Sequence, residues 1–155
     1  MIREGRPEES QQLTELILRS KAHWGYSAEF MARVRSELIL HAKDVVPHRT
    51  LVSELDGRLA GVATVTGTPP RGELDLLFVD PWAMGRGVGR ELFLEAAHRS
   101  RAEGFEELDI VADPGAESFY LKMGAARVGE SVSPSTGRAL PLLRYALNTS
   151  NSQSE

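Results

Sequence analysis

Residues 79–90 read VDPWAMGRGVGR, a glycine-rich turn that joins a strand pattern to a helix pattern. Glycines alternate at positions 85, 87 and 89, directly before an amphipathic segment that predicts a helix over 87–103. A turn without side chains leaves main-chain N–H groups free to approach an anion, and the positive end of the helix adds to the attraction. The stretch therefore predicts a phosphate cradle between a strand and a helix.

Two widespread phosphate-binding motifs do not fit this turn. A dinucleotide-binding GxGxxG pattern needs glycine at position 90, where the chain has Arg90, and a P-loop needs Gly-Lys-Ser/Thr, which the chain lacks. The glycines also suit a plain strand-to-helix turn with no ligand, and the turn alone leaves that interpretation open. A nucleotide-binding protein is a further alternative, which the missing glycine and lysine disfavour.

The rest of the chain alternates helix and strand signals around this turn. Further helices are expected over 7–19, from residue 28 onward after the N-cap Ser27, and over 116–123. Asp56-Gly57 is typical of a tight hairpin turn, so strands are expected over 48–55 and 58–66. The remaining strands are expected over 73–79, 108–111, 126–132 and 140–147, with a break at 68–72. This order predicts an α/β protein with a mixed sheet and helices on both faces.

Alternation along the strand over 73–79 divides its side chains into two sets. Glu73, Asp75, Leu77 and Val79 are expected on one face, and Leu74, Leu76 and Phe78 on the other. The strand is therefore expected to present two carboxylates side by side.

The composition predicts one folded domain with a short polar tail. The chain has 155 residues, of which 41% are hydrophobic and 26% charged, so it can bury a core. We expect one domain over 1–147 and a tail, NTSNSQSE, over 148–155 that contains nothing to bury. The N-terminus lacks the apolar stretch of a signal peptide, and no apolar run approaches the ~20 residues that span a bilayer. These features predict a cytoplasmic protein without membrane contact.

Charge and residue content exclude several classes of site. The net charge of −4 argues against a nucleic-acid partner, which requires a basic face. The absence of cysteine excludes a thiol nucleophile and cysteine-ligated metals. The four histidines show no metal-binding spacing, so no metal is expected.

Two motifs in this chain resemble those of the GNAT superfamily, the GCN5-related N-acetyltransferases. The first is R/Q-x-x-G-x-G/A, which the chain matches with Met84 at the Arg/Gln position and Gly87 and Gly89 at the two glycines. The second is A-x-x-F-Y-x-x-x-G-F/A, which residues 116–125 (AESFYLKMGA) match. The stretch over 137–143 is similar as well, so the resemblance spans nearly the whole chain. It implies a mostly antiparallel central sheet of about six to seven strands.

The resemblance also implies a reaction, the direct transfer of an acetyl group from acetyl-coenzyme A to an amine. A lysine-like amine, with a pKa near ~10.4, must lose a proton before it attacks, and a carboxylate on the central strand is suited to accept it. Glu73 and Asp75 are the candidates. Tyr120, the tyrosine of the second motif, is the candidate donor to the departing thiolate. The alternatives are a solvated acid pair, a water chain that acts as the base, and a core aromatic at Tyr120.

Coenzyme-binding residues are expected in three segments according to the same resemblance. The strand over 73–79 is expected to diverge from the strand over 108–111, so that its backbone pairs with the pantetheine arm. The glycine turn is expected to hold the pyrophosphate, and Asp113 stands where many members have asparagine, although it equally suits a helix cap before Pro114. The residues concerned are Leu77, Phe78, Val79, Met84, Gly85, Arg86, Gly87, Val88, Gly89, Arg90, Asp113, Ser118 and Tyr120.

The acceptor site is expected at the loop between the first two helices, which reads His23-Trp24-Gly25-Tyr26. Trp24, Tyr26 and Glu73 are the candidate acceptor-binding residues, since aromatic rings with nearby acids can hold a cation, although these rings equally suit packing of the helix pair. The acceptor is expected to be a primary amine on a small molecule or a peptide. A homodimer is one expected assembly, because family members commonly dimerise. The alternative function is a non-catalytic acyl-CoA sensor, which the departures at Met84 and Asp113 favour.

Overall fold

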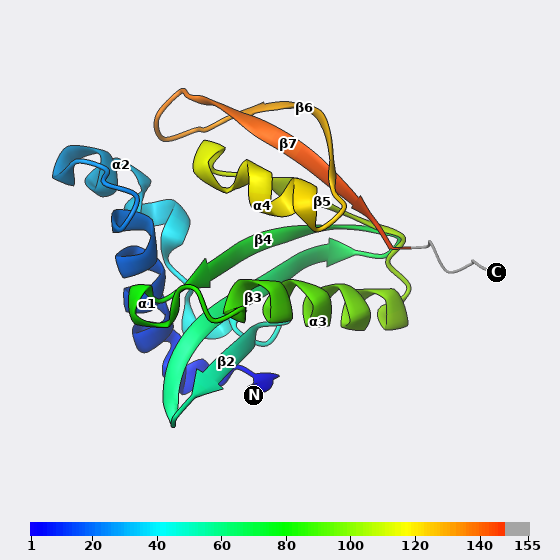
Figure 1. The fold of residues 1–155 in the computed structure, drawn as a ribbon, viewed down its shortest axis with the longest axis horizontal. Coiled ribbons are helices and arrows are strands. Elements are labelled where there is room, and N and C mark those ends of the chain that lie inside the picture. Colours follow the sequence, from blue (N-terminus) through cyan, green and yellow to red (C-terminus); the bar gives the residue numbers. More distant parts are fainter. Residues whose placement is uncertain (148–155) are drawn as a thin grey trace.

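The computed structural model describes residues 1–147, in which one seven-stranded sheet organises the chain (Figure 1). The strand order is β1-β2-β3-β4-β5-β7-β6, and every neighbouring pair is antiparallel except β4 with β5. The strands are β1 Ile2–Glu4, β2 Leu51–Leu55, β3 Arg58–Thr68, β4 Arg71–Val79, β5 Glu107–Val111, β6 Ala126–Val132 and β7 Ala139–Ala146. The predicted mixed, mostly antiparallel sheet is confirmed. The predicted tail over 148–155 lies outside the described residues.

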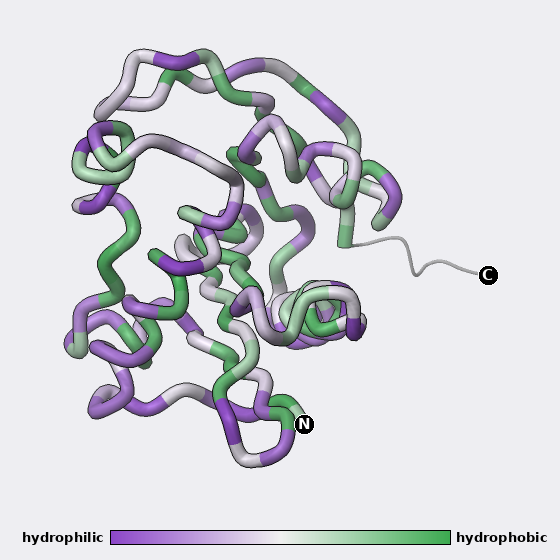
Figure 2. The backbone as a smooth tube through the Cα atoms, turned by 60° about the vertical axis from the view of Figure 1, so that its left-hand side comes forward, coloured by the Kyte–Doolittle hydropathy of each residue, from purple (hydrophilic) through white to green (hydrophobic). Residues whose placement is uncertain are grey.

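Helices cover both faces of this sheet, as the sequence predicts. They are α1 Ser10–Ala22, α2 Ala28–Leu38, α3 Val88–Glu103 and α4 Glu117–Lys122. Side chains of α1 and α2 form one core cluster with Val62 and Leu76, whereas α3 forms another with Ala63 and Leu74. Figure 1 shows α1 and α2 together on the left and α3 crossing in front of the sheet. Hydrophobic segments accordingly run through the centre of the molecule, and hydrophilic ones lie on its outer loops (Figure 2).

Several predicted local signals form as expected. Asp56 and Gly57 adopt positive φ angles of 53° and 76° and join β2 to β3 in the predicted hairpin. The Ser27 side chain accepts a hydrogen bond from the Phe30 N–H at 3.1 Å and so caps α2. The predicted strand over 48–55 begins too early, since β2 starts only at Leu51. His48 lies in the preceding loop, where its carbonyl accepts a hydrogen bond from Val65 N.

Three further predicted boundaries differ from the structure, and each lies in a segment that contains a proline. Pro7–Glu9 and Pro114–Ala116 form tight 3₁₀ turns, so α1 begins at Ser10 and α4 at Glu117. The expected break over 68–72 shrinks to Pro69 and Pro70, because the strands continue through glycine on both sides of the turn. A side chain at Gly72 would meet the Phe105 ring at 2.6 Å, so glycine is what allows the strand and that ring to pack together.

A β-bulge in β4 overturns the predicted alternation of its side chains. Thr64 of β3 pairs with Leu76 and Val65 pairs with Leu74, which leaves Asp75 as an extra residue without a partner. The Leu76 N–H donates instead to Thr64 Oγ1 at 3.1 Å. As a result Leu74 packs in the core on the α3 side, while Leu76 packs in the core on the α1 side. The expected common face of Leu74, Leu76 and Phe78 is therefore wrong at Leu74.

The parallel strands β4 and β5 stay together over only three residue pairs. They pair from Arg71 with Glu107 to Glu73 with Asp109, and β5 then continues alongside β7 as far as Val111. The predicted divergence of these two strands is confirmed. It leaves residues 74–79 of β4 without a strand neighbour on one side.

Candidate active site

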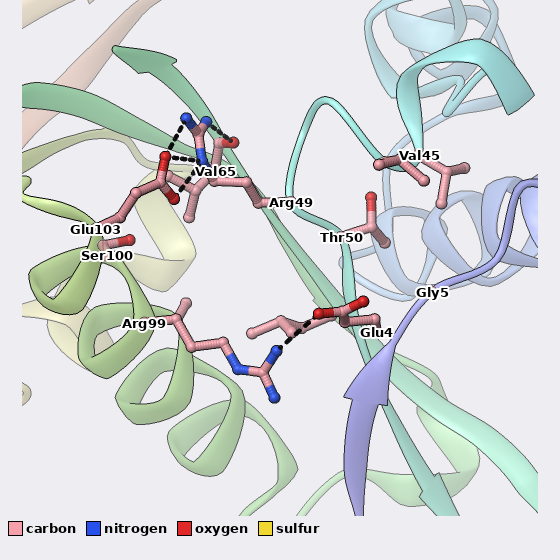
Figure 3. Close-up of a pocket in the computed structure, with 12 residues that line it drawn as sticks. Glu4, Gly5, Val45, Arg49, Thr50, Val65, Arg99, Ser100 and Glu103 are labelled. Atoms are coloured by element: carbon pink, nitrogen blue, oxygen red, sulfur yellow. Dashed lines mark hydrogen bonds and ion pairs between the residues drawn. The ribbon is translucent and has the colours of Figure 1, made fainter. Parts of the chain in front are cut away.

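Two cavities differ sharply in what lines them. The smaller, of about 230 Å³, lies between β1, α3 and the loop before β2 (Figure 3). Its charged groups form ion pairs with each other. Arg49 Nη2 lies 2.7 Å from Glu103 Oε2, and Arg99 Nη1 lies 3.4 Å from Glu4 Oε2. None of the predicted site residues lines it. The larger cavity, of about 620 Å³, opens where β4 and β5 diverge, and we call it the strand cavity.

Most of the predicted site residues meet in the strand cavity. Those that line it are Trp24, Glu73, Asp75, Leu77, Phe78, Val79, Met84, Gly89, Asp113 and Tyr120. The predicted residues outside its lining are Tyr26, Gly85, Arg86, Gly87, Val88, Arg90 and Ser118. Ser118 is exposed on α4, whereas Gly85 to Val88 form the turn that leads from the cavity wall into α3.

The glycine turn has the free donors that an anion site needs. Gly85 and Gly87 adopt φ angles of 84° and 79°, which other residues rarely tolerate. Within the described chain, the N–H groups of residues 85–90 donate no backbone hydrogen bond, because α3 begins at Val88 and its first ladder bonds start later. A run of six unpaired N–H groups at the positive end of a 16-residue helix suits a phosphate or pyrophosphate.

Asp75 lies close enough to Glu73 to raise its pKa despite the bulge between them. Burial raises the pKa of Glu73 above its ordinary 4.5, and the negative charges of Asp75 and Asp109 raise it further. Burial also raises the pKa of Asp75, although the nearby His48 opposes this shift. The pKa of each carboxyl group thus lies above its ordinary value, which suits a proton acceptor.

Tyr120 is a buried aromatic at the wall of the strand cavity. Its ring lies 6.1 Å from that of Phe93 and 5.1 Å from that of Phe119, and 7% of the residue is exposed. Burial raises the pKa of the Tyr120 phenol, so the hydroxyl stays protonated at neutral pH. Tyr120 therefore packs in the core and also lines the strand cavity.

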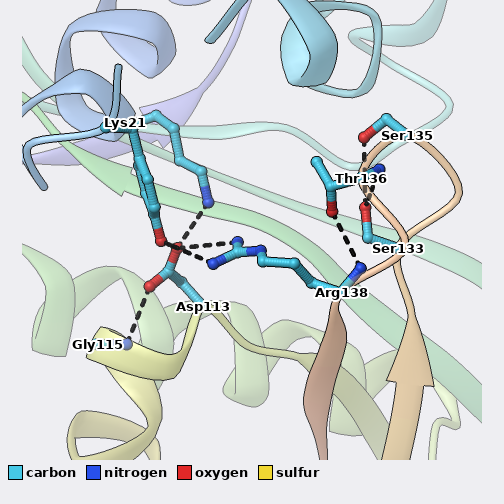
Figure 4. A network of polar contacts seen from close by, with 8 residues as sticks. Lys21, Asp113, Gly115, Ser133, Ser135, Thr136 and Arg138 are labelled. Carbon is cyan, nitrogen blue, oxygen red and sulfur yellow. Dashed lines mark hydrogen bonds and ion pairs between the residues drawn. The ribbon is translucent and has the colours of Figure 1, made fainter. Parts of the chain in front are cut away.

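Asp113 holds together four separate chain segments (Figure 4). Its Oδ2 accepts hydrogen bonds from Lys21 Nζ at 2.7 Å and from the Tyr26 hydroxyl at 2.6 Å, and Oδ1 accepts one from Gly115 N at 2.9 Å. Arg138, in the loop between β6 and β7, lies 3.9 Å from the same Oδ2. Asp113 thus caps the turn after β5, as predicted, and also fixes the end of α1 and the loop before α2.

The aromatic loop before α2 is already occupied by cations of this chain. Tyr26 stacks on Phe30 with ring centroids 4.1 Å apart, and Lys21 and Arg138 lie 5.1 and 5.3 Å from the Tyr26 ring. Trp24 packs on Gly115, where a Cβ atom would meet its ring at 2.6 Å. The expected role of these rings in packing the helix pair is therefore visible, and Lys21 and Arg138 are site residues that sequence reasoning missed.

Replacing Asp113 by asparagine is expected to destabilise the protein by about 1–3 kcal/mol, because the buried Lys21 ammonium loses its counter-ion. Although burial opposes it, hydrogen bonds from Lys21 and Tyr26 hold the pKa of Asp113 below its ordinary 3.8. The stabilisation is thus present above pH 3.8 and is lost as the pH falls through the lowered pKa. Urea unfolding at several pH values measures this, with Asp56→Asn in an exposed turn as control. Equal stability of wild type and D113N at pH 7 would contradict it.

The described residues contain neither a metal cluster nor a membrane span. No group of three or more His, Cys, Asp or Glu side chains within residues 1–147 is arranged to hold a metal ion. No helix in this part of the chain has the length and apolar character needed to cross a membrane.

Comparisons with known proteins agree with the motifs and the geometry. The model of the Acetyltransferase (GNAT) family matches residues 11–125. Over 150 residues the chain is 32% identical to the peptidyl-lysine N-acetyltransferase YjaB of Escherichia coli (strain K12), covering 94% of this chain and 95% of YjaB.

Two solved structures share the fold. The PaiA N-acetyltransferase of Thermoplasma acidophilum, solved in complex with coenzyme A, superposes with a TM-score of 0.76 at 21% identity, over 94% of this chain and 98% of that one. A GCN5-related N-acetyltransferase of Rhodopseudomonas palustris reaches a TM-score of 0.78 at 22% identity, over 94% of each chain. The sequence matches and the shared architecture lead to one conclusion: the chain belongs to the GNAT family of acetyltransferases.

Proposed function

We propose that this acetyltransferase passes the acetyl group of acetyl-coenzyme A to the side-chain amine of a lysine in a peptide. The strand cavity carries this proposal, because its lining contains two carboxyl groups with raised pKa values, a protonated phenol, and Met84 and Gly89 at the two ends of the glycine turn. The peptide lysine as acceptor is supported by the likeness to YjaB, whose name states that activity. Acetyl-coenzyme A supplies a thioester carbonyl that an amine can attack.

The proposed coenzyme site combines the glycine turn with the free edge of β4. The unpaired N–H groups of residues 85–90 suit the pyrophosphate, and the backbone of residues 74–79 offers donors and acceptors to the amides of the pantetheine arm. Met84 is 38% exposed beside this turn and lines the strand cavity. Asp113 lines the strand cavity and stays a predicted coenzyme-binding residue, and both of its oxygens also accept hydrogen bonds from this chain.

Glu73 and Tyr120 take the proposed proton-transfer roles. Glu73, directly or through a water molecule, accepts the proton that the acceptor ammonium must lose, and the amine then forms a C–N bond with the acetyl carbon. As the C–S bond breaks, the Tyr120 hydroxyl donates a proton or a hydrogen bond to the departing sulfur, and the nitrogen loses its second proton, to the phenolate or to water, to give the neutral amide. No cysteine is present to form a thioester intermediate with the enzyme, so direct transfer is the proposed course.

The experiment that tests the function measures free thiol and peptide mass together. Purified chain is incubated with acetyl-coenzyme A and a peptide that contains one lysine. Because the protein has no cysteine, a thiol reagent reports coenzyme A alone. We expect release of thiol to match the appearance of peptide with one added acetyl group. Binding of acetyl-coenzyme A without thiol release for any amine would instead favour the acyl-CoA sensor.

The pH profile of the reaction is expected to report Glu73. The acid limb of kcat/KM should have its midpoint above pH 4.5, since burial and neighbouring charges raise the pKa of this carboxyl group. Asp75→Asn removes one of those negative charges, so it should move the midpoint to lower pH. Glu29→Gln, an acid on the exposed face of α2, should leave it in place. An unmoved midpoint in D75N would contradict the proposed role of Glu73.

The sequence also predicts a cytoplasmic location and a homodimer as one assembly, and both stay predictions. Sedimentation of the purified chain at several concentrations would distinguish a monomer from a dimer.

A further inference from the structure

The strand cavity carries more negative charge than its own cations neutralise. Its charged lining consists of Lys21, Glu37, Glu73, Asp75 and Asp113. Lys21 and Asp113 form an ion pair, with Lys21 Nζ 2.7 Å from Asp113 Oδ2, and so neutralise each other. Among residues 1–147, the other three carboxylates take part in no ion pair.

The basic groups around the cavity act on acids other than Glu37. Arg138 lies against Tyr26 and Phe30 and beside Asp113, and Arg144 donates to Asp109 at 2.7 Å. His48 is the group whose charge acts on Asp75. Glu37 has no such neighbour among the ion pairs of the described chain, so its negative charge is uncompensated.

Glu37 is held in a defined position at the edge of the cavity. It lies in the last turn of α2, where the negative end of the helix disfavours an acid. Its Oε2 accepts a hydrogen bond from Ser135 N at 3.2 Å, which links α2 to the loop between β6 and β7. The helix dipole disfavours an acid at this position, whereas the Ser135 N–H fixes the carboxylate at the edge of the cavity, so Glu37 presents a negative charge to a ligand there.

The amine that is acetylated cannot neutralise all three unpaired carboxylates of the cavity. It must become neutral before it attacks, so a second cation on the acceptor is the group that can remain charged beside a carboxylate. We propose that Glu37 is a specificity-determining residue that selects acceptors bearing a second positive charge near the amine that is acetylated. This inference rests on the proposed function. A lysine beside a basic residue in a peptide has this chemistry, and so does a free diamine.

The test compares acceptors that differ only in charge. Three peptides with a single lysine carry arginine, glutamine or glutamate as its neighbour, and 1,4-diaminobutane is compared with butylamine. The arginine peptide and the diamine, the latter counted per primary amine because it has two equivalent ones, are expected to exceed their uncharged counterparts by about 2–5-fold in kcat/KM, the size typical of an exposed ion pair. The preference should shrink in high salt. A preference in one acceptor series alone identifies that series as the source of the substrate.

Glu37→Gln keeps the shape of the side chain and an oxygen for Ser135 N, and removes the charge. It is expected to abolish the preference by lowering kcat/KM for the arginine peptide while leaving the glutamine peptide unchanged. Glu29→Gln makes the same change near the start of α2, away from the cavity lining, and should keep the preference. Equal kcat/KM for charged and uncharged acceptors, or an undiminished preference in E37Q, would overturn the inference. Failure of the proposed function is distinct, because no acceptor would then release thiol.

Discussion

Tyr120→Phe is expected to lower turnover by about 10²–10⁴-fold, the range typical of losing a general acid, while acetyl-coenzyme A still binds. The reason is local, because the phenol lines the strand cavity and burial raises its pKa, which keeps its proton available to the departing sulfur. Phenylalanine retains the ring and its contact with Phe93. The loss should therefore appear in kcat, with the dissociation constant for acetyl-coenzyme A unchanged in calorimetry.

A matched control for this variant is Tyr145→Phe. Tyr145 also packs on Phe93, with ring centroids 4.8 Å apart, but it does not line the strand cavity. Its variant should retain nearly full turnover. If Tyr120→Phe also keeps wild-type kcat, the residue is a core aromatic and the proton reaches the sulfur from water.

Phe93→Ala is expected to lower the free energy of unfolding by about 3–5 kcal/mol, as is usual when a fully buried phenylalanine is truncated. Phe93 is 1% exposed, and its ring contacts those of Phe119, Tyr120 and Tyr145. For a chain of this size the loss corresponds to a fall in Tm of roughly 6–20 °C. The void left by the missing ring would also remove the support behind Tyr120. Turnover should therefore fall by more than the loss of folded protein explains.

Leu94→Ala is the control for that variant, since Leu94 is the next residue on α3 and is 42% exposed. Its unfolding free energy should stay within about 0.5 kcal/mol of wild type. Thermal unfolding followed by circular dichroism measures both variants. A loss of less than about 1 kcal/mol in F93A would show that the aromatic cluster repacks around the gap.

Local patterns in the sequence predicted the parts of the site that are local in the chain. The glycine turn over 85–89 and the helix behind it form as expected, because positive φ and an amphipathic stripe are properties of a few consecutive residues. The hairpin at Asp56-Gly57 follows for the same reason. That the glycine turn after β4 and the second motif after β5 belong to one site, with the two strands diverging between them, was implied by the family resemblance.

The missed features depend on partners that are distant in the chain. Asp75 becomes a bulge because Thr64 of the neighbouring strand supplies the hydrogen bond that Leu76 needs, and no pattern within LDLLF records this. The Asp113 network joins residues separated by 92 positions at Lys21, and Arg138 lies 112 positions from Tyr26. Charged residues at such separations read as ordinary surface positions until the fold brings them together.

The divergence of β4 from β5 has a consequence for the solubility of the protein. An unpaired strand edge is where foreign chains add to a sheet and where aggregation begins. Here the unpaired edge over 74–79 is recessed in the middle of the sheet, with Trp24, Phe119 and Val132 among the side chains around it. A slender, flexible ligand can reach that edge, whereas the strand of another protein meets these side chains first. The fold thus keeps a sheet edge available for binding and shielded from intermolecular pairing.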